Sequence, residues 1–208
     1  MKVIAHRGGA GANVGLENSL KAIKAAVKLD VDGIEIDVRV APGQISGIPV
    51  LKHDPLTPDD KDLTTLESAI AAVNRKIPLY IEVKPDEPID PVIGVIAQFL
   101  EKGWQSSDFF LLSYSQNTLQ ELHVAFPDIN KIVLERWSSI RAVLRARQLG
   151  TTYICMNQRW LWRGVIKSLA QRGFKLAAYT VDNPAQAKRW QNTGLEAIVT
   201  NYPERFKA

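Results

Sequence analysis

Short apolar runs alternate with longer segments of helical periodicity along this chain, and that alternation restricts its fold more than any other feature. Apolar strands that alternate with amphipathic helices predict an α/β fold in which helices cover the outer face of a parallel sheet. The strand candidates are residues 3–5, 33–38, 79–83, 109–114, 131–134, 152–156, 176–181 and 197–200. The helix candidates are residues 18–29, 66–73, 91–100, 116–125, 139–149, 164–171 and 184–192. Eight strands within 208 residues predict a compact (β/α)8 TIM barrel that forms one domain over residues 1–208.

One strand-like run, residues 49–53, is left over from this alternation. The connection from residue 39 to residue 48 is too short for the crossover helix that parallel pairing requires. We therefore predict an antiparallel β-hairpin arm after the second strand. A turn near Ile45 would place His53 opposite Asp37, because the two residues are equally distant from it.

Acidic residues gather on the second and third predicted strands. Glu35 and Asp37 are separated by one residue, so both point to the same face of their strand, and Glu82 and Lys84 repeat this spacing. Ionised groups inside a barrel are costly unless they are paired, solvated or bound to a metal. Three converging carboxylates favour a site for a hard cation such as Mg²⁺ or Ca²⁺. An interior salt-bridge cluster with Lys84 and Arg7 is the alternative.

Two of the three histidines, His6 and His53, stand at predicted strand ends, where reactive groups collect in such barrels. Near a carboxylate cluster, this pair favours a general acid and a general base. Arg7 and Lys84 provide the positive charge that binding of a phosphate requires. The third histidine, His123, lies in the middle of a predicted helix, where a surface or packing role is expected.

Composition and charge exclude several other classes of protein. The formal net charge is +4, and no long basic run predicts a nucleic-acid-binding arm. Cys155 is the only cysteine, which excludes an intramolecular disulfide. No signal-peptide core follows the N-terminus and no apolar run approaches the length of a membrane span, so we expect a cytoplasmic protein without stable membrane insertion. The sequence leaves the oligomeric state open.

Five spaced motifs together resemble the glycerophosphodiester phosphodiesterase family in both order and spacing. The motifs are His6-Arg7-Gly8, Glu17-Asn18-Ser19, Gly33-Ile-Glu35-Ile-Asp37-Val38, Pro49-Val-Leu-Lys-His53-Asp54 and Ile81-Glu82-Val83-Lys84. The resemblance extends from residue 4 to about residue 204 and includes segments around residues 113, 180 and 200. It implies a (β/α)8 barrel that hydrolyses small glycerophosphodiesters to an alcohol and glycerol 3-phosphate with one divalent cation, Mg²⁺ or Ca²⁺.

Carried over to the matching positions, the resemblance implies a role for each motif residue. Glu35, Asp37 and Glu82 would be metal ligands. His6 and His53 would be the general acid and base. Arg7 and Lys84 would hold the phosphate, and Glu17 and Asn18 would support the first loop. The attacking group, water or the neighbouring glycerol hydroxyl, stays open.

The chain departs from the family pattern at two informative places. Asn201 stands where the family has an aspartate near the end of the domain. Residues 55–65, before the second predicted helix, are shorter than the family's partly helical insertion, so the pocket is expected to be more open and the alcohol group stays unassigned.

Two alternative functions remain beside the simple phosphodiesterase. A lipid-headgroup phospholipase of the sphingomyelinase D-like type would share the histidine pair and the acidic site. Trp160 and Trp162 would favour it if they were exposed at an interface, but we expect both to be buried. The other alternative is a non-catalytic barrel that binds phosphodiesters, although the set of candidate residues is complete.

Overall fold

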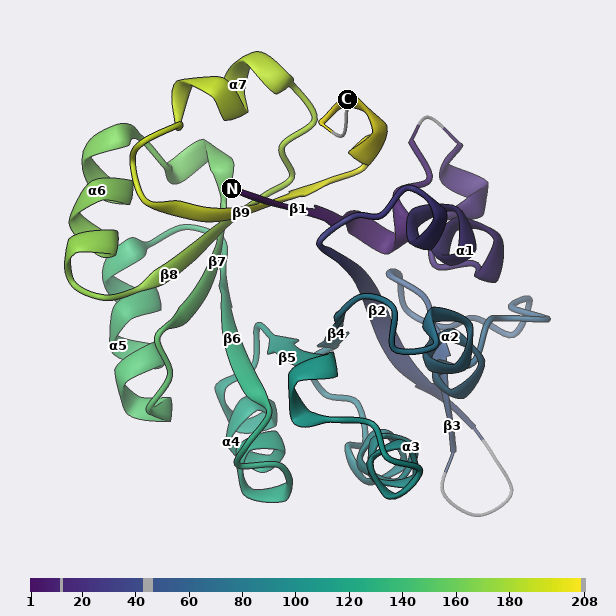
Figure 1. Cartoon of the computed structure of the whole chain (residues 1–208). Coiled ribbons are helices and arrows are strands. Elements are labelled where there is room, and N and C mark those ends of the chain that lie inside the picture. Colours follow the sequence, from purple (N-terminus) through teal and green to yellow (C-terminus); the bar gives the residue numbers. More distant parts are fainter. Residues whose placement is uncertain (12, 43–46, 207–208) are drawn as a thin grey trace.

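The computed structural model describes residues 1–11, 13–42 and 47–206, and its centre is a closed barrel of eight parallel strands (Figure 1). The strand order is β1-β9-β8-β7-β6-β5-β4-β2, and pairing of β1 with β2 closes the ring. The barrel strands are β1 (Lys2–Ala5), β2 (Gly33–Ala41), β4 (Leu79–Val83), β5 (Phe109–Ser113), β6 (Asn130–Glu135), β7 (Tyr153–Asn157), β8 (Lys175–Tyr179) and β9 (Leu195–Thr200). The predicted (β/α)8 barrel is confirmed.

Helices surround this barrel on its outer side (Figure 1). They are α1 (Leu20–Lys28), α2 (Leu66–Val73), α3 (Asp90–Glu101), α4 (Gln116–Ala125), α5 (Ser139–Leu149), α6 (Arg163–Gln171) and α7 (Pro184–Arg189). After β9, the described chain continues into a short 3-10 turn, Pro203–Arg205, where the ideal fold has an eighth helix. Within the described residues, no helix combines the length and the apolar character that a membrane span needs.

Polar caps determine where the helices begin. The side chains of Ser19, Thr65, Ser115 and Ser138 each accept a hydrogen bond from a backbone N–H of the first turn that follows. Each such cap stabilises its helix by about 1 kcal/mol. The helix predicted at residues 18–29 therefore begins at Leu20, and Asn18 stays outside it with a φ of 57°.

Alternation along each strand separates two kinds of core. In β4, Leu79, Ile81 and Val83 pack under the helices, whereas Tyr80 lies in the cluster that fills the barrel. That interior cluster contains Ile4, Tyr80, Leu112, Ile132, Leu134, Cys155, Ala197 and Val199. Gly33 leaves room for it, since a Cβ at this position would lie 2.4 Å from the Tyr80 ring. Apolar side chains thus fill the barrel below the polar groups at its carboxyl end.

A hairpin formed by β2 and β3 (Ile48–Leu51) extends beyond the barrel, as predicted (Figure 1). Its register differs from the prediction by one residue, because Val38 pairs with Leu51. The Lys52 N–H accordingly donates to the Asp37 carbonyl at 3.1 Å, and the expectation that His53 stands opposite Asp37 was wrong. The register depends on the length of the turn, which residue spacing does not encode. The expected turn near Ile45 lies outside the described residues.

The connection between β3 and α2 is short and contains no helix in the described chain, in agreement with the predicted shortened insertion. A single bridge between Val50 and Thr65 holds its two ends together. The Leu51 N–H also donates to the Thr64 carbonyl at 2.7 Å. The segment that carries His53 is therefore anchored at both ends.

Candidate active site

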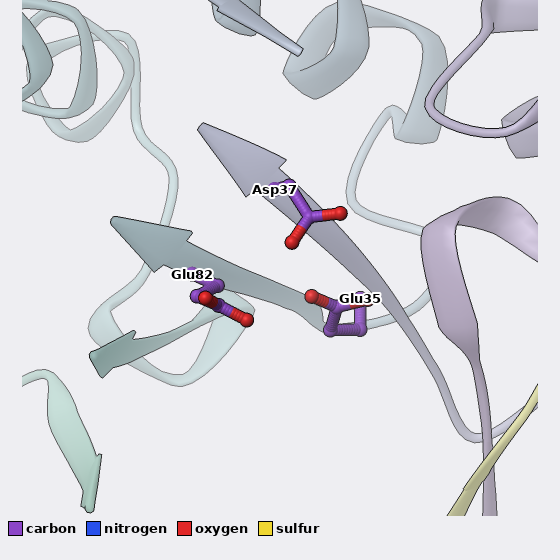
Figure 2. A group of neighbouring side chains, drawn as sticks. All are labelled: Glu35, Asp37 and Glu82. Atoms are coloured by element: carbon purple, nitrogen blue, oxygen red, sulfur yellow. The ribbon is translucent and has the colours of Figure 1, made fainter. Parts of the chain in front are cut away.

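Three buried carboxylates from two neighbouring strands meet at the carboxyl end of the barrel. Glu35 and Asp37 come from β2 and Glu82 from β4, and the three side chains point toward one another (Figure 2). Asp37 pairs in register with Glu82. One oxygen from each lies within 4.8 Å of the others. The structure therefore brings together the three residues that the sequence identified as metal ligands.

Two cations contact this acidic group. Lys84 Nζ contacts Asp37 Oδ1 and lies 2.6 Å from Glu82 Oε1. Arg7 Nε lies 3.0 Å from Asp37 Oδ2, and its Nη1 lies 2.6 Å from Glu17 Oε2. The interior salt bridges that the sequence left as an alternative are therefore present. They do not exclude a metal, because the charges do not balance.

The charge balance of this cluster leaves room for a divalent cation. Four carboxylates, counting Glu17, share two cations, which leaves two negative charges when all four are ionised. Glu35 has no lysine or arginine side chain at ion-pair distance among the described residues. Burial, together with the carboxylates of Asp37 and Glu82, raises the pKa of Glu35 well above its ordinary value. Oxygen ligands with unbalanced negative charge suit Mg²⁺ or Ca²⁺, so the residues fit such an ion.

The first loop is tied to the acidic group by several hydrogen bonds. The Arg7 N–H donates to Glu35 Oε2 at 3.0 Å. Asn18 donates from Nδ2 to Asp37 Oδ2 at 3.0 Å and accepts from the Asp37 N–H at 3.1 Å. Burial raises the pKa of Asp37, but the charges of Lys84 and Arg7 outweigh it and lower that pKa. Lys84 and Arg7 therefore keep Asp37 ionised, and Asn18 fixes its orientation.

His6 is held by residues from the last strands of the barrel. Its Nδ1 lies 2.6 Å from Asn201 Oδ1, and Asn201 Nδ2 donates to Asp182 Oδ2 at 2.9 Å. Because the Asn201 amide nitrogen is directed at Asp182, its oxygen accepts from His6 Nδ1–H. The other ring nitrogen, Nε2, lies 3.8 Å from Glu35 Oε2. Burial, followed by the charge of Arg7, lowers the pKa of His6 and favours a neutral ring.

His53 lies beyond β3, on the more open side of the same cavity, and its side chain is 47% exposed. Its Nδ1 lies 2.8 Å from Asp54 Oδ1. Arg39 donates to the His53 carbonyl from Nε at 3.1 Å and from Nη2 at 2.9 Å, and it pairs with Glu87 at 2.7 Å. The hairpin arm thus places the second histidine at the cavity.

The two histidines, the three carboxylates, Arg7 and Lys84 line one cavity of about 860 Å³. Glu17, Asn18 and Asn201 are not part of its lining and contact these residues from outside it. The opposite wall was not identified from the sequence. It comes from the ends of β5, β6, β7 and β8 and from the first turns of α5, and it includes Tyr114, Glu135, Arg136, Arg141, Arg145, Asn157 and Tyr179. One sequence signal could have identified part of this wall. The residue two positions after the last interior residue of a strand points to the same side, and this rule selects Tyr114 and Arg136.

Exposed tryptophans stand close to this wall. Trp160 is 44% and Trp162 is 62% exposed, so the expectation that both are buried was wrong. Trp160 packs edge-on against Trp137, which lines the cavity and is 57% exposed. Trp160 ends a 3-10 turn (Gln158–Trp160) after β7, and Trp162 directly precedes α6; both rings lie outside the helix–barrel core. His123 is exposed on α4, as expected.

A family model of known proteins matches nearly the whole chain. The model describes the glycerophosphoryl diester phosphodiesterase family, and it matches residues 6–67 and 52–205. The two segments overlap at residues 52–67, which span the short connection between β3 and α2. The chain is also 27% identical over 234 residues to YhdW of Bacillus subtilis (strain 168), which carries a provisional assignment as a glycerophosphodiester phosphodiesterase. That alignment covers 98% of this chain and 96% of YhdW.

Solved structures share the fold over almost the full length. A phosphodiesterase from Oleispira antarctica, solved with its product sn-glycerol-3-phosphate, has a TM-score of 0.84 and 22% identity, with 99% of this chain and 94% of that chain covered. A glycerophosphodiester phosphodiesterase from Parabacteroides distasonis has a TM-score of 0.79 and 20% identity, with coverage of 98% and 94%. With the family model matched from residue 6 to residue 205, the chain belongs to the glycerophosphoryl diester phosphodiesterase family, a family of phosphoric diester hydrolases.

Proposed function

We propose that this protein hydrolyses small glycerophosphodiesters to glycerol 3-phosphate and an alcohol, with one divalent cation and two histidines that transfer protons. The observation that carries the proposal is the meeting of both histidines, three acids, Arg7 and Lys84 in one cavity of about 860 Å³. Family membership supports the reaction class. The product in the Oleispira antarctica structure supports glycerol 3-phosphate as the phosphate-bearing product here.

Glu35, Asp37 and Glu82 would hold the cation. When bound, a divalent cation neutralises charge on the non-bridging oxygens of a phosphodiester and lowers the barrier to attack at phosphorus. Lys84 bridges two of these carboxylates, and Arg7 contacts Asp37. Both cations stand beside the acidic group, where they favour binding of an anionic diester.

The two histidines differ in a way that suggests separate roles. His6 is buried, with Nδ1 bonded to Asn201, and its lowered pKa leaves Nε2 with a free lone pair. We assign His6 as the general base that takes a proton from the attacking hydroxyl. His53 is half exposed, so solvent can return a proton to it after each turnover. We assign it as the general acid that protonates the leaving alcohol oxygen.

The test is release of glycerol 3-phosphate from glycerophosphocholine, glycerophosphoethanolamine and glycerophosphoglycerol, with Mg²⁺, with Ca²⁺ and with chelator. We expect turnover that depends on the cation and that the His53→Ala variant loses. A folded protein that releases no glycerol 3-phosphate under any of these conditions would contradict the proposal. Retention of calorimetric cation binding in the variant separates a catalytic defect from a loss of the metal site.

The exposed tryptophans favour a second candidate, a phospholipase that acts on lipid headgroups at an interface. Trp137 lines the cavity and is 57% exposed, and Trp160, which packs against it, is 44% exposed. Amphipathic rings at this position could contact lipid headgroups, and Trp162 is 62% exposed two residues further on. Activity is measured on vesicles of sphingomyelin, or of phosphatidylcholine that contains lysophosphatidylcholine, and on soluble diesters at equal phosphate. The comparison separates the two candidates. Faster turnover of vesicles, lost in a Trp160→Ala Trp162→Ala variant, would favour the second candidate.

A further inference from the structure

On three neighbouring strands, the last interior residue and the residue two positions later both line the cavity. The pairs are Glu82 and Lys84 on and after β4, Leu112 and Tyr114 on and after β5, and Leu134 and Arg136 on and after β6. All six residues line the cavity. Arg136 is therefore the first residue after β6, as Lys84 is the first residue after β4, and both line the cavity that holds the acidic group.

Arg136 differs from the other cations of the cavity in its partners. Arg7, Arg39 and Lys84 each have a carboxylate at ion-pair distance, and so do Arg141 and Arg145. Within the described chain, the guanidinium of Arg136 has no such carboxylate. Its contacts are the Tyr114 ring, 5.5 Å from its centre, and the Trp137 ring at 5.8 Å. An arginine left unpaired in a cavity that binds phosphodiesters is available for an anionic ligand group.

The surrounding residues hold Arg136 in place. Glu135 accepts hydrogen bonds at 2.9 Å from the N–H groups of Arg136 and Trp137. The Arg141 guanidinium donates two further hydrogen bonds to the same carboxylate. Arg145 donates at 2.8 Å to the carbonyls flanking this wall, those of Leu134 and Tyr114.

The phenols of this wall are also fixed. The Tyr114 hydroxyl donates to the Tyr179 hydroxyl at 2.6 Å, and the latter donates to the Glu135 carbonyl at 3.2 Å. Hence the backbone on both sides of Arg136 and the ring beneath it are held before any substrate arrives.

We propose that Arg136 determines specificity by binding a second negative group, a phosphate or carboxylate, on the alcohol part of the diester. This inference rests on the proposed function and names its substrate class. On this wall, three arginines face one carboxylate, that of Glu135, so the wall carries a net positive charge. The Tyr114 face, which could otherwise bind a quaternary ammonium, is already covered by a guanidinium. Anionic alcohol groups are thus favoured over choline.

The experiment compares three diesters on the metal-loaded protein: glycerophosphoglycerol, the same diester with a phosphate on its distal glycerol, and glycerophosphocholine. The first two differ only in the extra phosphate. We expect kcat/KM for the phosphorylated diester to exceed that for glycerophosphoglycerol by about tenfold or more, and that for glycerophosphocholine to be the lowest.

The variant Arg136→Met keeps the apolar stem that packs on Tyr114 and removes the charge. We expect the variant to lose kcat/KM for the phosphorylated diester about tenfold more strongly than for glycerophosphoglycerol, so that the preference disappears. Arg159→Met is the matched control, because Arg159 is exposed on a nearby loop and does not line the cavity. It should keep the wild-type preference.

The possible results distinguish a failure of the role proposed for Arg136 from a failure of the proposed phosphodiesterase function. Hydrolysis of glycerophosphoglycerol with no preference for the extra phosphate, or a preference that Arg136→Met retains, overturns the role of Arg136 and leaves the proposed phosphodiesterase function intact. If no diester is hydrolysed with any cation, the proposed function fails. The same comparison is then made by calorimetric binding of the two diesters, and equal affinities in wild type and Arg136→Met overturn the inference.

Discussion

His6 and Asn201 lie at opposite ends of the chain, 195 positions apart, yet His6 Nδ1 is 2.6 Å from Asn201 Oδ1. Closure of the barrel produces this contact, because β1 pairs with both β2 and β9. Asp182 orients the amide from the far side with a 2.9 Å hydrogen bond. At the position where the sequence departs from the family's aspartate, a neutral amide thus accepts from the His6 ring.

The first prediction concerns this contact. Asn201→Ala removes the acceptor that fixes the His6 ring, and we expect kcat to fall about tenfold or more, with a much smaller change in KM. Steady-state kinetics on glycerophosphoglycerol measures both constants. Asn117→Ala, at an exposed position of α4, is the control and should leave them unchanged. A variant in which KM rises and kcat is retained would show that Asn201 acts on substrate binding instead.

The second prediction concerns the acidic triad. Glu82→Gln removes one carboxylate while keeping its size, so we expect the Kd for Mg²⁺ or Ca²⁺ to rise about tenfold or more. Calorimetry measures this affinity. Thermal unfolding provides a second readout, because a cation that binds the folded state raises the wild-type Tm more than that of the variant. Glu67→Gln, exposed at the start of α2, is the control. Equal affinity in wild type and Glu82→Gln would remove Glu82 from the site.

The interior face of each strand could be read from the sequence, because side chains alternate with a period of two. Glu35, Asp37 and Glu82 follow from that rule alone. The position of His53 required a turn length that the residue pattern does not contain, and the hairpin register was therefore displaced by one residue. Arg136 was missed because it follows its strand, past the last position where an apolar pattern marks the interior. Tyr114 ended the strand predicted at residues 109–114, but the pattern gave no reason to place it in the site.

The exposure of Trp160 and Trp162 could not be predicted from the sequence either. An apolar residue in a connection packs only if a neighbouring element covers it. The path between β7 and α6 leaves Trp160 and Trp162 without such cover. The Asn201–His6 contact has the same origin, since it depends on closure of the ring and not on any local pattern.

The third prediction separates the histidines. His53→Ala should lower kcat/KM about 100-fold or more, because a proton-transfer group is lost. Since its side chain is half exposed, the free energy of unfolding should change by less than about 0.5 kcal/mol. Turnover and urea unfolding of the same preparation measure the two effects. The exposed His123 on α4 offers a matched control, and His123→Ala should retain full activity. Full activity in His53→Ala would exclude His53 as the general acid.

The last prediction concerns acid stability and Glu135, whose carboxylate is 1% exposed. Burial raises the pKa of Glu135, but hydrogen bonds from Arg141 and from the Trp137 and Ser138 N–H groups outweigh it, so the pKa is lowered below 4.5. A lowered folded pKa stabilises the fold above the unfolded value, and this contribution is lost as the pH falls through the folded value.

We therefore expect Glu135→Gln to lower the free energy of unfolding by about 2 kcal/mol near neutral pH. The difference between wild type and variant should shrink as the pH falls below 4.5, because the wild-type carboxylate then becomes protonated as well. Urea unfolding across that range measures it, and Glu121→Gln, exposed on α4, corrects for the titration of surface carboxylates. A difference that stays constant with pH would mean that Glu135 stabilises the protein by packing and not through its charge.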